Sequence, residues 1–157
     1  MSESPVGPAS PEHALLAADA GTWEADIEFR PAPGAPPQTS RGVSNNRMLG
    51  GRWLIADFRN ETGFEGHGIY GWDPVRRKYT GTWVDSLRSF LAVAEGTYDD
   101  ASRTLTLWAE ARLPDRLLRW REVTERPDED TRLFRILVAL DGGGEFAPMT
   151  VRYRRRR

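Results

Sequence analysis

Residues 22–30 alternate between apolar and polar side chains without a break. One face of this segment carries Trp23, Ala25, Ile27 and Phe29, and the other face carries threonine, acids and arginine. A period of two places alternate side chains on opposite faces of a β-strand, whereas a helix needs a period near 3.6. The segment therefore predicts a strand with one buried and one solvated face, and such a strand has to belong to a sheet.

The rest of the chain repeats short strand-like runs, which are separated by Gly, Pro, Asn and Asp turn signals. No helical pattern of 10–15 residues lies between the runs, which excludes a parallel sheet with helical crossovers. Short connections predict an antiparallel up-and-down meander, and closure would remove its exposed edges. We therefore predict an all-β fold, a closed barrel of about ten antiparallel strands, with a two-sheet sandwich as the alternative. After 22–30, the predicted strands are at about residues 39–49, 52–60, 64–73, 78–86, 88–98, 103–111, 117–126, 131–140 and 146–154.

The N-terminal segment has a different character. Residues 1–9 are small, polar and rich in proline, which predicts a disordered tail. Ser10 followed by Pro11 has the pattern of an N-cap and a first helical position, and Gly21 is the expected end of the helix. A helix this short cannot form a core, but it can plug one end of a barrel. Residues 10–157 are thus predicted to form a single domain.

Composition excludes several classes of protein. The net charge is −1, which argues against a nucleic-acid binder that neutralises phosphates. The arginine-rich residues 152–157 are interpreted as a solvated strand end, with an arm for anionic surfaces as the alternative. The absence of cysteine excludes disulfides, zinc–thiolate sites and a cysteine nucleophile. No secretory signal or run of roughly 20 apolar residues is present, so we expect a cytoplasmic protein without a membrane span.

The strand faces predict an interior that is both aromatic and polar. Six tryptophans and four tyrosines are present, and several share a predicted face with charged side chains. A ten-stranded barrel encloses more volume than side chains readily fill, and buried charges need partners. An aromatic cavity with a few polar groups is typical of a small-molecule site. The alternative is that the aromatics simply pack while the charges face solvent. The predicted ligand-binding residues are Trp23, Trp53, His67, Tyr70, Trp83, Asp85, Glu95, Trp108, Glu110, Arg121 and Tyr153.

Motifs for established chemistry are absent. The chain has no phosphate-binding loop, dinucleotide fingerprint, zinc-protease helix or nucleophile elbow. Of its two histidines, His13 is expected to be exposed and His67 lies in a glycine-rich strand. A single histidine makes a poor metal site, so we predict neither a metal nor a cofactor. His67 or a buried carboxylate such as Asp85 is the candidate for moving a proton, and no catalytic residue is assigned.

Seven short motifs are spread along the chain: AGTWE at 20–24, LGGR at 49–52, YGWD at 70–73, WVDS at 83–86, EG at 95–96, REV at 121–123 and VRYR at 151–154. Together they resemble a bacterial family of small lipocalin-like barrel proteins of unknown function. The resemblance covers about residues 11–155 and implies a calycin-type antiparallel barrel, without an established activity. A looser similarity links the chain to haem-binding barrels of the nitrobindin type, which bind iron through a histidine late in the chain. No histidine follows His67 here.

Three functions are compatible with these patterns. The favoured one is a barrel that binds a small apolar or amphipathic molecule in an aromatic and polar cavity. The second is an enzyme of the isomerase or cyclase type that uses a buried carboxylate or histidine in the same cavity. The third is a structural or protein-interaction barrel with a packed interior. A homodimer is compatible with the sequence. Of the enzymatic and non-enzymatic functions, the sequence favours a non-enzymatic one.

Overall fold

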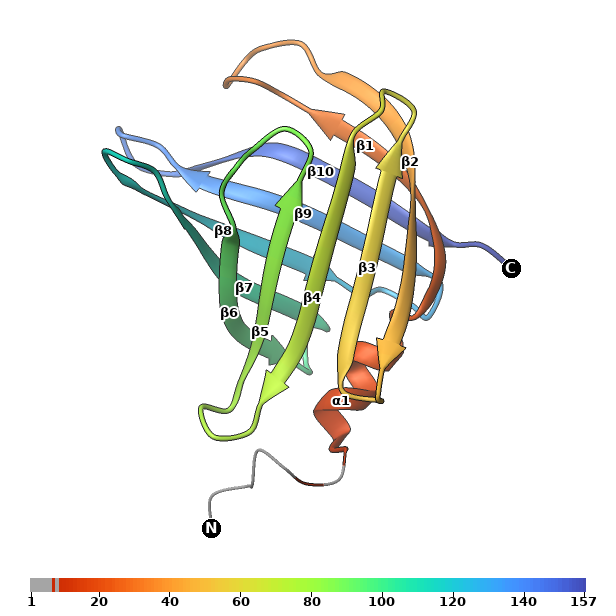
Figure 1. Ribbon diagram of the computed structural model, residues 1–157. Helices are drawn as coiled ribbons and strands as arrows, with labels where there is room; N and C mark the ends of the chain where they lie inside the picture. Colours follow the sequence, from red (N-terminus) through yellow and green to blue (C-terminus); the bar gives the residue numbers. More distant parts are fainter. Residues whose placement is uncertain (1–6, 8) are drawn as a thin grey trace.

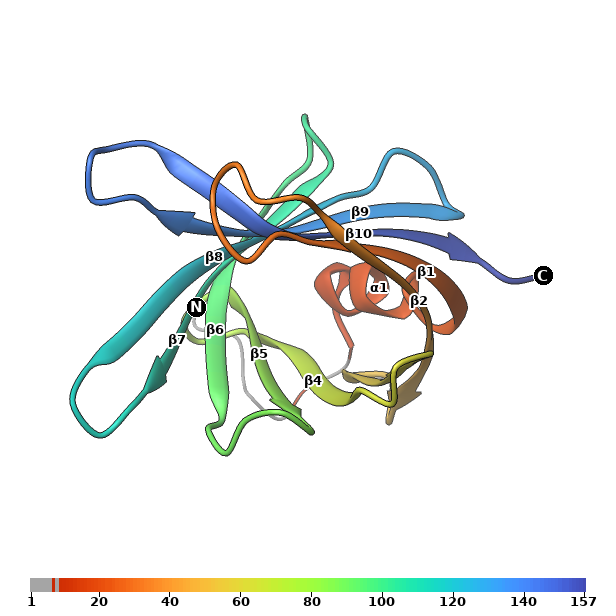
Figure 2. The same cartoon turned by 90° about the horizontal axis from the view of Figure 1, so that it is seen from above.

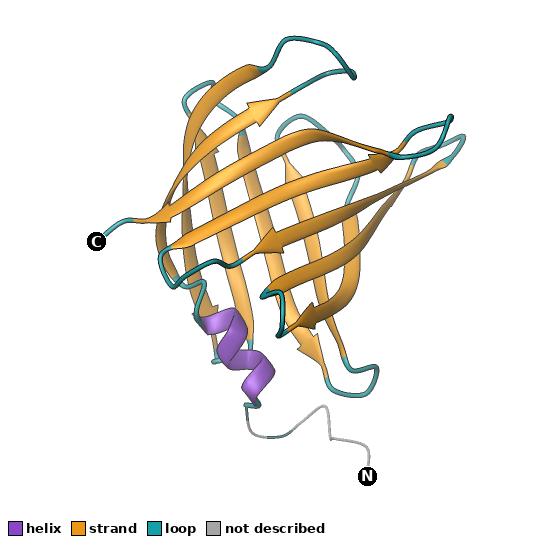
Figure 3. Ribbon diagram, turned by 180° about the vertical axis from the view of Figure 1, so that it is seen from behind, coloured by secondary structure: helices purple, strands orange, loops and turns teal. Residues whose placement is uncertain are grey.

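The computed structural model describes residue 7 and residues 9–157 of the chain. Within these residues, a single short helix, α1 (Pro11–Ala17), precedes ten β-strands. The predicted tail over residues 1–9 falls, except for Gly7 and Ala9, outside the described residues. The strands, shown in Figures 1 and 3, are β1 (Gly21–Phe29), β2 (Gln38–Leu49), β3 (Trp53–Asn60), β4 (Glu65–Asp73), β5 (Lys78–Asp85), β6 (Ala92–Asp99), β7 (Thr104–Arg112), β8 (Leu117–Glu125), β9 (Thr131–Ala139) and β10 (Glu145–Arg155).

The ten strands form one closed antiparallel barrel. Each strand pairs with its neighbours in the chain, and β1 closes the ring by pairing with β10. Figure 2 shows the barrel from the end opposite α1. The arrangement confirms the predicted all-β up-and-down barrel. It excludes the sandwich, because the pairing of β1 with β10 leaves no open sheet edge.

The strand boundaries lie within one residue of the predicted ones, with one exception. The strand predicted to begin at residue 88 begins at Ala92. A turn occupies the intervening residues, where the Asp85 carboxylate accepts the backbone N–H of Leu87 at 3.0 Å and a guanidinium N–H of Arg88 at 3.0 Å. Leu87 is 74% exposed, so its side chain has no neighbouring strand to pack against.

Helix α1 begins where predicted but ends earlier. It stops at Ala17, and Gly21 opens β1 with a φ of 119°. The prediction that His13 is exposed is wrong, because this side chain folds back on the helix start and accepts the backbone N–H of Ser10 at 2.9 Å. Burial and the nearby Arg52 lower the pKa of His13. Within the described chain, no helix has the length and hydropathy to cross a membrane.

The helix closes one end of the barrel, as Figures 1 and 2 show. Leu16 is 4% exposed and packs with Leu54, Tyr79 and Leu107 from three strands. The Tyr79 hydroxyl donates to the carbonyl oxygen of Glu12 at 3.4 Å, and burial raises the pKa of Tyr79 to about 12. This apolar contact lets a helix of seven residues remain docked, because packing rather than propensity stabilises short helices.

A group of charged residues surrounds this closed end. The Oδ1 atom of Asp19 lies 3.1 Å from a guanidinium nitrogen of Arg126 and 2.8 Å from one of Arg132. The guanidinium groups of Arg132 and Arg155 lie 4.9 and 4.3 Å from the ring centroid of Trp23. Arg155 also donates to two backbone carbonyls of the segment that follows α1. Arg155, near the C-terminal end of the chain, thus fixes the segment that joins α1 to β1.

Candidate functional site

Polar side chains from three distant strands face the interior of the barrel. The register places alternate residues of each strand on the inner face, beginning with the buried Trp23 and Ala25 on β1. On this face lie Tyr70 of β4, Glu122 of β8 and Tyr153 of β10. All three are half-buried, although they belong to the middle of the barrel. Tyr70 packs against the Leu16 cluster, and Tyr153 packs against a second apolar cluster of Ala25, Ile27, Phe58 and Val151.

The large aromatic rings of β4 and β5 lie along the wall rather than across the interior. A methyl group added at Gly81 would lie 2.6 Å from Cδ1 of Tyr70, and one added at Gly68 would lie 2.6 Å from Cε2 of the same ring. A methyl group at Gly66 would lie 2.1 Å from Cζ2 of Trp83. The glycines therefore let both rings rest against the backbone of the barrel wall.

Glu122 is the central titratable group of the interior. Trp120 Nε1–H donates to its Oε1 atom at 3.0 Å. Burial raises the pKa of Glu122, and the hydrogen bond from Trp120 opposes that effect only in part. The pKa values of Tyr70 and Tyr153 are also raised, by burial first and then by the charge of Glu122. Tyr70, Glu122 and Tyr153 are called the central group of the inner face below.

Replacing Glu122 by glutamine is expected to raise the free energy of unfolding at pH 8, with the gain disappearing towards pH 4. The folded protein, in which this pKa is raised, binds the proton more tightly than the unfolded chain. Stability is therefore lost as the pH rises from the ordinary carboxyl pKa through the raised one. Glutamine carries no charge and still accepts from Trp120. Melting temperatures of both proteins from pH 4 to pH 8 measure the effect, and a difference that stays constant with pH would contradict the raised pKa.

Five of the residues predicted from the sequence lie on the inner face. Tyr70 and Tyr153 belong to the central group, and Trp23 lies at the closed end between two arginines. Trp83 Nε1–H donates to Asp85 at 3.1 Å. The Asp85 side chain is 3% exposed and is held by this bond and by the turn after β5, so it is already satisfied.

The other six predicted residues lie on the outer face, and the structure does not bring them to the interior. Trp108 is 62% exposed, with the guanidinium of Arg121 at 5.8 Å from its ring. His67 Nδ1 lies 2.6 Å from a carboxylate oxygen of Asp57 in an exposed pair. Glu95 pairs with Arg76 and Lys78. The outer set is Trp53, His67, Glu95, Trp108, Glu110 and Arg121.

Sequence reasoning missed Glu122 and Trp120. The strand around them has bulky or charged residues on both faces, so its inner side is ambiguous from its own pattern. The partner strands do not resolve the ambiguity, because Glu122 lies opposite Leu107 and Ile136 while Arg121 lies opposite Trp108 and Leu137. Both faces of this strand meet large apolar side chains, so the sequence does not single out Glu122.

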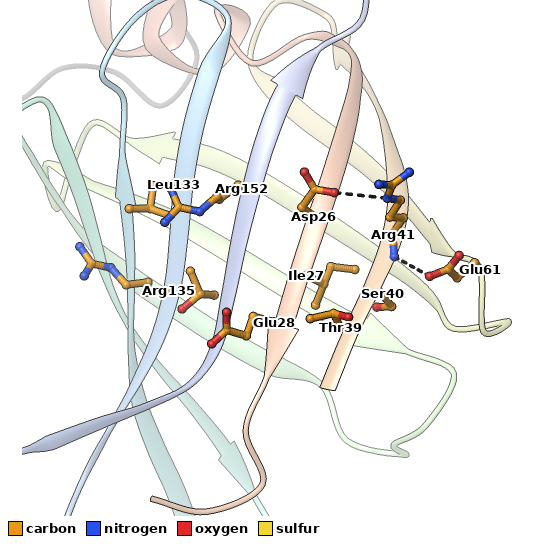
Figure 4. A pocket seen from close by; sticks show the side chains of 11 residues that line it. Asp26, Ile27, Glu28, Thr39, Ser40, Arg41, Glu61, Leu133, Arg135 and Arg152 are labelled. Carbon is orange, nitrogen blue, oxygen red and sulfur yellow. Dashed lines mark hydrogen bonds and ion pairs between the residues drawn. The ribbon is translucent and has the colours of Figure 1, made fainter. Parts of the chain in front are cut away.

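A concave region lies on the outside of the barrel. This groove of about 580 Å³ crosses β1, β2, β9 and β10 (Figure 4). Acidic and basic side chains both line the groove, and Oδ1 of Asp26 lies 3.7 Å from Nε of Arg41. The backbone N–H of Arg41 also donates to the Glu61 carboxylate at 3.0 Å. No predicted site residue lines it. Among the described side chains, no group of three His, Asp or Glu is arranged as a metal site.

Comparison with known proteins supports the fold. The crystal structure of Rv2717c from M. tuberculosis superposes with a TM-score of 0.71, covering 96% of this chain and 100% of that one. The two sequences are 13% identical, so the similarity concerns the fold alone. A search of curated proteins finds no match. Residues 8–155 match the model of a family described as proteins of unknown function, which confirms the resemblance found in the sequence. The chain belongs to this family, DUF1579.

Proposed function

We propose that the barrel binds one small, partly apolar molecule in its interior, with the polar end of the molecule at Tyr70, Glu122 and Tyr153. The observation that carries this proposal is the central group of three titratable side chains. They come from three strands, they are enclosed by the barrel wall, and each retains accessible surface. Among the described residues, these three side chains make one hydrogen bond, the bond that Glu122 accepts from Trp120.

The cost of burying these groups supports a role in binding. A buried carboxyl or hydroxyl without a hydrogen-bond partner costs roughly 1–3 kcal/mol. The Nε1–H group of Trp72, which also faces the interior, is buried without an acceptor. A ligand with a polar end and an apolar body would satisfy the polar groups. It would also cover the aromatic walls, which is the usual composition of a small-molecule site.

The end of the barrel opposite α1 is the proposed entrance to this interior. Helix α1 packs against the other end (Figure 2), so a ligand would enter between the loops at the opposite one. The turn after β5 contributes exposed apolar side chains there, with Leu87 74% and Leu91 54% exposed. Mouths of β-barrels are common positions for ligand sites.

Titration with 1-octanol and 2-phenylethanol tests the proposal. We expect both probes to change tryptophan fluorescence and raise the melting temperature. In Tyr70→Phe and Tyr153→Phe, the affinity should fall by roughly 5- to 30-fold, because one polar partner is lost while the ring remains. Trp108→Phe, on the outer face, is the control and should bind as the unchanged protein does. A lack of binding by both probes, or equal binding by all variants, would favour a packed interior.

The raised pKa of Glu122 also favours a second candidate function, proton transfer to or from a bound substrate. A carboxyl in an enclosed apolar site is a recurrent general acid or base. Glu122 suits this role better than Asp85 or His67, because Asp85 is held by donors and His67 lies outside the barrel. Glu122→Gln would then abolish turnover while the protein still binds 1-octanol.

A further inference from the structure

We infer that the interior selects amphipathic organic cations, in particular primary or substituted amines, over neutral and anionic molecules of the same size. This inference rests on the proposed function and specifies the class of ligand. The geometry behind it is the Glu122 carboxyl, which accepts from Trp120 through one oxygen while the other has no hydrogen-bond partner among the described residues. Glu122 lies on an inner face that also carries several aromatic side chains.

The charged side chains on the inner face are ion-paired near both ends of the barrel but not at Glu122. Arg132 and Arg155 point inward at the closed end, but both are ion-paired there and stacked on an indole ring. Asp85, near the open end, is paired with Arg88 at 3.0 Å. Glu122 lies between these two groups, and no ion pair involves it among the described residues. The centre of the barrel thus has a negative group that lacks a counter-ion.

Aromatic side chains make up much of the inner face on which Glu122 lies. Tyr70, Trp83 and Trp120 belong to the same inner face as Glu122. Aromatic faces attract cations through their quadrupole, and the attraction grows when water is excluded. An ammonium group would also donate a charge-assisted hydrogen bond to the free oxygen of Glu122. An anion would meet a like charge. A neutral alcohol would also donate a hydrogen bond to the carboxylate, but it would gain neither the attraction between opposite charges nor the cation–π contact.

The test compares three probes with the same eight-carbon chain: octylamine, 1-octanol and octanoate. Calorimetric titration at pH 8 should give about tenfold or more tighter binding for octylamine than for the other two. If the alcohol or the acid binds as tightly as the amine, the inference fails while the proposed function stands. If none of the three binds, both fail.

Two variants separate the role of Glu122 from a general surface effect. Glu122→Gln should abolish the preference for the amine and leave the binding of 1-octanol within about twofold. Glu110→Gln removes a carboxylate on the outer face and should change none of the three affinities. Retention of the amine preference in Glu122→Gln would overturn the assignment of Glu122 as the cation partner.

A permanently charged probe provides the matching pH dependence. The affinity for octyltrimethylammonium should rise from pH 4 to pH 9, because only the ionised form of Glu122 attracts the cation. The titratable groups that face Glu122 from β4 and β10 are Tyr70 and Tyr153, whose raised pKa values keep them neutral over this range. Binding that does not change with pH would contradict the inference.

Discussion

Replacing Gly96 by alanine is expected to lower the melting temperature of the barrel by about 10 °C. Gly96 lies on the inner face of β6, opposite Leu107 on β7. A methyl group added there would lie 1.8 Å from the carbonyl oxygen of Thr106 and 2.8 Å from its carbonyl carbon. These are backbone atoms of the paired strand, so the clash is relieved only by separating β6 from β7. Overpacking of this kind costs about 3 kcal/mol, and each kcal/mol shifts the melting temperature by about 2–4 °C in a domain of this size.

Gly142→Ala is the matched control for this experiment. Gly142 lies in the β9–β10 turn, and a methyl group added there meets nothing within 4 Å. Its melting temperature should remain within about 2 °C of the unchanged protein. Thermal unfolding followed by circular dichroism measures both variants. Equal melting temperatures for Gly96→Ala and Gly142→Ala would show that the β6–β7 contact is looser than described.

Asp19→Asn is expected to destabilise the closed end by about 2–4 kcal/mol. The Asp19 carboxylate serves two guanidinium groups, those of Arg126 and Arg132, whose side chains are 7% and 6% exposed. Removing one partner of a buried ion pair leaves an uncompensated charge, which costs about 3–5 kcal/mol when the pair is fully buried. The Asp19 side chain is 22% exposed, so water recovers some of that cost. Denaturant unfolding measures the change.

Asp57→Asn provides the surface comparison for Asp19→Asn. Asp57 pairs with His67, but its side chain is 59% exposed. Exposed ion pairs contribute about 0–1 kcal/mol, so this variant should unfold almost as the unchanged protein does. If the two variants lose the same stability, the arginines at the closed end do not depend on Asp19, and the docking of α1 has another cause.

Most of the fold was predictable because the strands of this barrel follow local rules. The alternation in residues 22–30 and the Gly, Pro and Asp turns determine where strands begin and end, and those positions agree with the structure. The exception at β6 has a local cause as well. The Asp85 turn delays the strand to Ala92, and sequence alone does not show that this carboxylate accepts hydrogen bonds from the turn.

The candidate site was only partly predictable, because its residues are defined by long-range register. A shift of one residue moves every side chain of a strand to the opposite face. Residues on strands with one clearly apolar face, such as Trp23 and Tyr153, were placed correctly on the inside. On β7 and β8 both faces carry large side chains, so Trp108 and Arg121 were selected although they lie outside, and Glu122 was missed.

Locating a bound probe tests the central claim, a ligand site inside the barrel, most directly. Crystals grown with 8-bromooctan-1-ol, and separately with (8-bromooctyl)trimethylammonium, allow the bromine to be found from its anomalous scattering. We predict a bromine peak inside the barrel, with the polar end of at least one probe beside Tyr70, Glu122 and Tyr153. Peaks confined to the outer groove over β1, β2, β9 and β10, or an interior without density for either probe, would contradict the claim.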